Sequence, residues 1–287
     1  MGQSLAKLKD EMIFNQDLTR LVDAMKGIAA AQYHVMDHKR TKVTELEKSL
    51  DELFTVYDFR SLHHPFVRPC KERRLICAVT TDSGFLGGLN MKVTQAAMKL
   101  EEDDSMFLLI GERGATSMKE FGKKVIALPG INADDTRHAL VDQTVKEITA
   151  RLVKKEFGKV IMIYPHPTSF SSQRIESLNL LPCPAFYKNR APQVPTSQQQ
   201  AKGVILESAP GPVVEYLTEV WLRKRLTEIF EYAKMAEFGA RVMHLEESYS
   251  TLTKSAKALK LQFFKARREK IDASLRETFS AKLVNEE

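Results

Sequence analysis

Two long stretches of the chain carry apolar residues at alternating steps of three and four. In the C-terminal stretch these positions are Leu245, Tyr249, Leu252, Ala256, Leu259, Phe263 and Ala266. In the N-terminal stretch they are Leu18, Val22, Met25, Ala29, Gln32 and Met36, and the stepping resumes at Val43, Leu46, Leu50 and Leu53. A period of about 3.5 residues is typical of a coiled-coil seam. We therefore expect two long helices that pair as an antiparallel coiled coil, although separate packing of each helix onto a core remains an alternative.

Glycine and proline divide the chain into three parts. Residues 3–64 contain one glycine, Gly27, and residues 213–287 contain one, Gly239, with no proline in either stretch. Most helix-breaking residues therefore lie between these stretches. The predicted domains are an N-terminal long helix at 1–64, an α/β domain at 65–212 and a C-terminal long helix at 213–287.

The middle part has a different pattern of apolar residues. Short apolar runs rich in β-branched residues occupy 75–79, 106–110, 125–128 and 160–164. Stretches long enough for helices separate them, at 89–101, 114–122 and 134–157. Continuous apolar runs are typical of parallel strands buried on both faces. The predicted fold class is α/β: a Rossmann-like βαβ domain with a mostly parallel sheet, joined to the coiled coil.

Composition excludes several classes of protein. The apolar fraction of 43% is that of a folded chain, and no apolar run is long enough for direct membrane insertion. The cysteines at 70, 77 and 183 are odd in number and unclustered, so we expect buried free thiols rather than disulfides or a zinc site. The net charge of +6 suggests an acidic partner but does not specify nucleic acid.

The densest glycine cluster directly follows the first predicted strand. It contains Asp82, Gly84, Gly87, Gly88 and Asn90, and it has neither the GxGxxG nor the GxxxxGK[ST] spacing. We predict a tight strand-to-helix turn rather than a nucleotide site. No catalytic, metal or cofactor site is expected elsewhere; the pair His34 and His38, for example, lacks a third ligand and reads as a solvated helix face.

The last helix is strongly basic. Its cations are Lys254, Lys257, Lys260, Lys265, Arg267, Arg268, Lys270, Arg276 and Lys282. Nucleic acid is one partner that suits such a face, and a sleeve of protein with acidic loops is another. Composition does not separate the two.

Five blocks, in order, resemble the γ-subunit family of F-type ATP synthases. They are LTRLVDAMKGIAAAQY (18–33), TTDSGFLGGLN (80–90), FLLIGERGATSMKEFG (107–122), AEFGARVMHLEES (236–248) and FKARREKIDASLRETFSA (264–281). The positions that match the family's motifs are Met25, Ala29, Ala30, Asp82, Gly84, Gly87, Asn90, Glu237, Ala240, Arg241, Arg267, Ile271, Leu275, Glu277 and Ser280.

Four positions depart from the family's pattern. Ser83 replaces an arginine, Phe264 an asparagine, Arg268 a glutamine and Ser274 a glutamate. In the family, the asparagine and glutamine belong to a polar patch that engages the catch loops of the β subunit. The resemblance therefore implies a divergent member with rewired catch contacts.

The resemblance implies a non-catalytic rotor shaft that couples ion flow to ATP synthesis. Its coiled coil would turn inside the hexamer of α and β subunits, and its α/β foot would bind the ε subunit and the membrane c-ring. Such a chain is expected at the cytoplasmic face of the cell inner membrane, as a peripheral subunit without nucleic acid or cofactor. The expected rotor–β contacts are Met25, Arg267, Arg268, Ile271 and Glu277.

Three other functions remain alternatives. The first is a γ-like subunit of a sodium-coupled or otherwise alternative rotary ATPase. The second is a coiled-coil scaffold or nucleic-acid-binding protein with a Rossmann-like domain. The third is a small-molecule enzyme that uses the glycine turn at 84–88.

Overall fold

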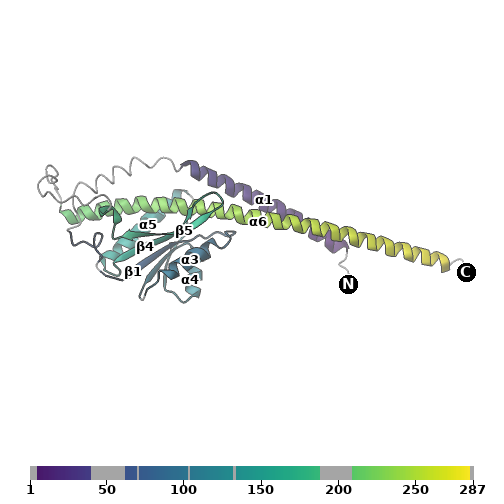
Figure 1. Ribbon diagram of the computed structural model, residues 1–287, viewed down its shortest axis with the longest axis horizontal. Coiled ribbons are helices and arrows are strands. Elements are labelled where there is room, and N and C mark those ends of the chain that lie inside the picture. The colour runs from purple at the N-terminus through teal and green to yellow at the C-terminus, as the bar shows by residue number, and fades with distance from the viewer. Residues whose placement is uncertain are drawn as a thin grey trace. The chain divides into compact units, whose positions relative to one another are not determined.

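The computed structural model describes residues 5–39, 62–69, 71–102, 104–131, 134–187 and 209–284. Its elements are, in order, α1 (Leu5–Lys39), β1 (Arg74–Val79), α3 (Leu89–Lys99), β2 (Met106–Ile110), α4 (Glu112–Glu120), β3 (Val125–Leu128), α5 (Asp134–Val153), β4 (Lys159–Pro167), β5 (Gln173–Leu181), the 3-10 helix η3 (Pro184–Phe186) and α6 (Pro210–Val284). The chain forms two compact units, one of residues 1–31 with 241–287 and one of residues 32–240 (Figure 1).

The larger unit is built on a five-stranded sheet with the order β3-β2-β1-β4-β5. The pairs β1–β2, β1–β4 and β2–β3 are parallel, and only β4–β5 is antiparallel. The predicted fold class, a mostly parallel α/β sheet with long terminal helices, is confirmed. All four predicted strands are present, whereas β5 was not predicted.

Helices cover both faces of this sheet (Figure 1). On one face, Ile76 and Ala78 of β1 pack against α3 and α4. On the other face, Leu75, Cys77 and Val79 of the same strand pack against α5 and the first part of α6. Alternate strand residues point to opposite faces, so β1, at the centre of the sheet, is apolar at successive positions and buried on both sides.

The helix α6 begins at Pro210, with Pro212 also inside its first turn. A proline in the first turn removes no helical hydrogen bond, because those N–H groups have no partner within the helix. Pro210 and Pro212 thus lie inside α6 rather than before it. The predicted domain limits, at 64/65 and 212/213, remain predictions. The second part of the N-terminal seam, Val43 to Leu53, and Cys70 lie outside the described residues.

In the smaller unit, α1 and α6 lie side by side and run in opposite directions (Figure 1). Val22 and Ala29 of α1 and Leu245 of α6 are buried. The predicted seam positions further along α6 are half-buried, from Tyr249 to Ala266, and the residues between most of them are exposed. The burial pattern thus follows the predicted coiled-coil seam.

The helix pair is also joined by a cation. The Lys26 ammonium group lies 3.0 Å from a carboxylate oxygen of Glu246 and 4.6 Å from the centre of the Tyr249 ring. Hydrogen bonds with Asp23 and Glu246 raise the pKa of Lys26 above its usual value. Lys26 therefore stays charged at neutral pH and links the two helices.

The seam prediction is wrong at one position of α1. Gln32 is exposed, whereas Tyr33 is only 7% exposed and packs in the larger unit against Met235 and Phe238. A straight helix turns at 3.6 residues, so its buried face drifts away from a strict 3.5-residue repeat. At this point the buried position has moved forward by one residue.

Candidate functional site

The glycine-rich turn after β1 is held by the side chain of Asp82. One Asp82 carboxylate oxygen accepts the N–H of Glu112 at 2.6 Å, and the other accepts the N–H of Gly130 at 2.9 Å. Glu112 is the first residue of α4, and Gly130 follows β3. Asp82 therefore joins the loops that follow β1, β2 and β3 at the carboxyl edge of the sheet.

Asn90 fixes the other end of this turn. Its amide group accepts the N–H of Thr81 at 3.1 Å and donates to the Thr81 carbonyl oxygen at 3.3 Å. Gly87 and Gly88 have φ angles of 55° and 83°, in the left-handed region that favours glycine, and Gly88 caps α3. The five predicted turn residues thus lie between the end of β1 and the first turn of α3.

The same geometry bears on nucleotide binding at this turn. A helix N-terminus attracts phosphate through its free N–H groups and its dipole. At the start of α4 that place is taken by the Asp82 carboxylate. A Cβ atom on Gly130 would lie 2.6 Å from the same carboxylate, so the loops close tightly around it. The turn is filled by the chain's own anion, which argues against the enzyme alternative based on residues 84–88.

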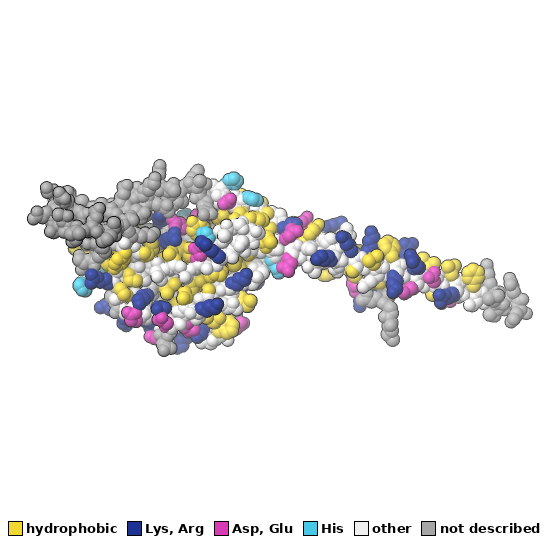
Figure 2. All heavy atoms as spheres, in the orientation of Figure 1, with side chains coloured by type: hydrophobic (Ala, Val, Ile, Leu, Met, Phe, Trp, Pro, Cys, Tyr) yellow, Lys and Arg dark blue, Asp and Glu magenta, His cyan; other side chains and the backbone are white. Residues whose placement is uncertain are grey.

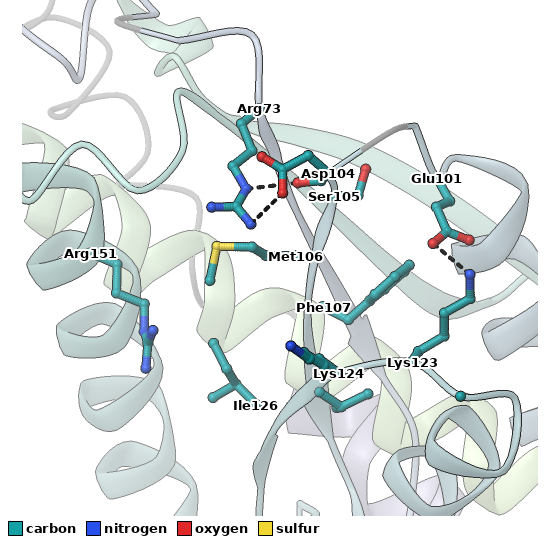
Figure 3. A pocket seen from close by; sticks show the side chains of 12 residues that line it. Arg73, Glu101, Asp104, Ser105, Met106, Phe107, Lys123, Lys124, Ile126 and Arg151 are labelled. Atoms are coloured by element: carbon teal, nitrogen blue, oxygen red, sulfur yellow. Dashed lines mark hydrogen bonds and ion pairs between the residues drawn. The ribbon is translucent and has the colours of Figure 1, made fainter.

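A pocket of about 440 Å³ opens at the opposite, amino edge of the sheet (Figure 3). Several of its charged residues are paired with one another. Arg73 lies 2.8 Å from Asp104, and Lys123 lies 2.7 Å from Glu101. Arg151 of α5, also in the wall, pairs with carboxylates outside the pocket. No predicted site residue lines this pocket, so it is separate from the glycine turn.

The antiparallel pair β4–β5 carries a polar cluster next to α6. The Tyr164 hydroxyl donates to Glu176 at 2.8 Å, and the Arg174 guanidinium donates to it at 2.6 Å. Burial alone would raise the pKa of Glu176, but these hydrogen bonds outweigh burial and hold that pKa below its usual value. Burial, with the hydrogen bond to Glu176, raises the pKa of Tyr164. The cluster is therefore a charged carboxylate held by a neutral phenol and a cation.

The predicted rotor–β contacts are spread along the smaller unit. Arg267, Arg268, Ile271 and Glu277 are exposed on α6, while Met25 is half-buried in the seam. The residue after Met25 contacts Tyr249, which lies about 27 Å from Arg267 along the helix at 1.5 Å per residue. The structure thus groups the four α6 residues and leaves Met25 apart from them.

The sequence-based prediction missed a set of exposed apolar residues on the same part of α6. They are Leu261, Phe264, Ile271, Leu275 and Phe279, with exposed fractions from 49% to 72%. Figure 2 shows apolar and cationic side chains alternating along this helix. Ile271 was proposed as a contact and Phe264 was noted as a substitution at a catch-loop position, whereas Leu261, Leu275 and Phe279 were not proposed. Their signal in the sequence is that apolar residues continue outside the seam positions.

Comparisons with known proteins agree over most of the chain. The family model described as "ATP synthase" matches residues 4–281. The chain belongs to the ATP synthase family. Within this family its relatives include the ATP synthase gamma chains of Halothermothrix orenii, 24% identical over 96% of both chains, and of Bdellovibrio bacteriovorus, 20% identical over 96% of this chain and 97% of the relative.

Solved ATP synthase structures share the fold. A chain of the Euglena gracilis mitochondrial ATP synthase, in an assembly described as OSCP/F1/c-ring, has a TM-score of 0.68 at 14% identity and covers 98% of this chain and 94% of its own length. A chain from the Tetrahymena thermophila central stalk and c-ring has a TM-score of 0.55 at 17% identity, covering 79% of this chain and 99% of its own.

These matches confirm the resemblance drawn from the five sequence blocks. The chain is thus a gamma-type member of the ATP synthase family, and this identity makes it a non-catalytic subunit. Among the described residues, no group of three or more His, Cys, Asp or Glu side chains could hold a metal ion. Within the same residues, no helix has the length and apolarity needed to cross a membrane.

Proposed function

We propose that this gamma chain couples ion flow to ATP synthesis through the exposed part of α6, which turns inside a ring of α and β subunits. The observation that carries the proposal is the mixture of exposed apolar and cationic side chains on that helix. Exposed apolar residues in this number are typical of a surface that a partner covers. The cations Arg267 and Arg268 would contact acidic loops of the β subunits, with Ile271 and Glu277 beside them.

The other partners follow from the same proposal. The larger unit, residues 32–240, is called the α/β unit from here on. It would be the foot that binds the ε subunit and the membrane c-ring. The related structures come from assemblies whose descriptions name F1, the rotor and the c-ring, which supports this assignment. The chain would then sit at the cytoplasmic face of the cell inner membrane and reach the membrane only through its partners. Met25 is proposed as a further contact near the α1–α6 seam.

The coupling itself is a population shift in the β subunits. A shaft changes the nucleotide affinity of a β site only if it contacts the β conformations differently. The exposed part of α6 is asymmetric about its axis, because at about 100° per residue its exposed apolar residues, Leu261 to Phe279, fall on one face of the helix. Each rotation step would present a different part of that face to a given β subunit, so that each site passes through different affinities in turn.

The first experiment is co-expression with the cognate α and β subunits, followed by size exclusion and an ATPase assay. We expect one copy of the chain to co-elute with the hexamer and to sustain its turnover. Elution of the chain alone, with hexamer ATPase unchanged by its presence, would overturn the proposed function.

The proposed contacts are tested by charge reversal in the assembled complex. Arg267→Glu with Arg268→Glu should reduce ATP-driven proton pumping relative to ATPase, because repulsion replaces attraction at the acidic loops. The matched control is Lys119→Glu with Lys124→Glu, which makes the same charge change at exposed positions of the α/β unit. Equal pumping in the two double variants, with normal assembly, would count against the α6 contacts.

A further inference from the structure

In the larger unit, α6 passes through a segment that is buried all around. Six consecutive residues, Met235 to Ala240, are each at most 7% exposed or fall in the buried class. Successive residues of a helix point about 100° apart, so six in a row cover more than a full turn. A helix on the surface of a domain buries only one stripe. The α/β unit therefore surrounds α6 at this level, and we call residues 235–240 the collar segment.

The first contact on the collar segment comes from the tip of the β4–β5 hairpin. A Cβ atom on Gly239 would lie 2.7 Å from the carbonyl oxygen of Phe170, closer than side chains approach in proteins. Glycine therefore lets the hairpin backbone rest directly on the helix. The Phe170 ring packs beside Met235 and Phe238.

The same phenylalanine also holds α1. Its ring meets the Tyr33 ring edge-on at 4.9 Å and stacks on His34 at 5.8 Å with an interplanar angle of 9°. Aromatic pairs in these geometries attract one another beyond the effect of burial. One side chain at the hairpin tip thus contacts both helices at the same level.

Two further loops complete the collar. Leu86, from the turn after β1, and Leu89, the first residue of α3, pack against Ala240. From the loop after β3, the carbonyl oxygen of Ile131 accepts a hydrogen bond from Lys234 at 2.9 Å, and Lys234 also pairs with the buried Glu237 at 2.8 Å. Lys234, Gly239 and Ala240, which make these contacts with other elements, point in three different directions around the helix axis. The contacts therefore oppose rotation of α6 about its own axis within the unit.

We infer that the collar segment is where the α/β unit transmits torque to α6. Phe170 is the positioning residue, and Gly239 accommodates the Phe170 backbone. This inference rests on the proposed rotor function. A load applied to the α/β unit passes into α6 sideways, through packed side chains and backbone, rather than only along the chain from element to element. The interior of a protein is close-packed and stiff, so these contacts transmit torque with little twist.

The experiment measures the torsional stiffness of the assembled complex. The α and β subunits are fixed to a surface, a bead is attached to the α/β unit, and angular fluctuations are recorded while the complex is stalled between ATP turnovers. In Gly239→Ala the new methyl group displaces the Phe170 backbone, and we expect the angular variance to rise at least twofold. The matched control is Gly27→Ala, a mid-helix glycine with no atom within 4 Å of the added methyl, which should leave the variance unchanged.

A second set of three variants keeps the inference testable if Gly239→Ala fails to assemble. Phe170→Ala removes the ring from the hairpin tip and should also raise the variance at least twofold, while Phe170→Tyr should restore it and Ser171→Ala, at the exposed neighbour, should leave it unchanged. A purely structural role of Phe170 would lower thermal stability without changing the variance of complexes that assemble.

The outcomes separate the two ideas. If complexes with the unchanged chain show no rotation driven by ATP, the proposed function fails. If they rotate, and Phe170→Ala has the same angular variance as Ser171→Ala, the rotor function stands and the inference about the collar segment is wrong.

Discussion

The carboxylate of Asp82 is the contact whose removal should affect the α/β unit most clearly. It accepts two backbone N–H groups, at 2.6 and 2.9 Å, from two different loops. A hydrogen bond to a charged group contributes about 1.5–3 kcal/mol, and Asp82 is half-buried, so the lower end of the range applies to each. Asp82→Ala should therefore lower the free energy of unfolding by about 3 kcal/mol, and Asp82→Asn, which retains one acceptor oxygen, by about half of that.

The assay uses the chain's single tryptophan. Trp221 packs against the core between the sheet and α6, so its fluorescence during urea unfolding reports on the α/β unit rather than on the helix pair. With a slope of about 2–3 kcal/mol per molar urea for a unit of this size, the midpoint of Asp82→Ala should fall by about 1 M. Glu72→Ala, at an exposed carboxylate of the same unit, is the control and should keep its midpoint.

A second result would follow from the same geometry. Without its own carboxylate, the N-terminus of α4 is open to an anion. Phosphate should therefore raise the urea midpoint of Asp82→Ala more than that of the unchanged chain, because a ligand that binds only the folded state stabilises it. A midpoint for Asp82→Ala equal to that of Glu72→Ala would refute the reasoning at its first step.

Three further predictions concern charged groups. Lys234→Ala takes away one ion pair of Glu237, which is 1% exposed, and should lower the free energy of unfolding, measured by Trp fluorescence, by up to about 3 kcal/mol. Adding Glu237→Leu should reduce this loss. Because the pKa of Glu176 is lower in the folded state, its stabilisation is present above about pH 4.3 and is lost as the pH falls. Glu176→Gln should thus make stability less dependent on pH as the pH falls below about 4.3, and an unchanged slope would contradict this. Lys26→Ala removes the contacts of Lys26 with Glu246 and with the Tyr249 ring, and should lower the free energy of unfolding by about 1 kcal/mol. The measurement is the thermal midpoint of helix loss in circular dichroism, which should fall.

Much of the fold could be read from the sequence because its elements have strong periodic signals. The four parallel strands are continuous apolar runs, and the helix pair repeats its apolar residues at coiled-coil spacing. The strand β5 gave no such signal. It lies at the edge of the sheet, and most of its residues, Gln173 to Asn179, are exposed or half-buried and largely polar. An edge strand is defined by its neighbour rather than by its own composition.

The interactions at the candidate sites could not be predicted, because they join residues far apart in sequence. The partners of Asp82 lie 30 and 48 positions away, so a local motif identifies the turn but not what its carboxylate binds. The collar segment was hidden for a different reason. It includes Glu237 and Gly239, a charged residue and a helix-weakening one, and neither indicates burial until the surrounding loops are known.

The exposed apolar residues of α6 have a consequence for the chain before assembly. An unassembled copy presents Leu261 and Phe279, at 72% and 65% exposure, to the solvent. Such surfaces favour self-association and are the kind that chaperones and proteases bind. A cell that makes more of this chain than of its partners should therefore lose the surplus to degradation or aggregation. The helix that would serve the assembled complex thus ties the lifetime of the free subunit to the supply of the others.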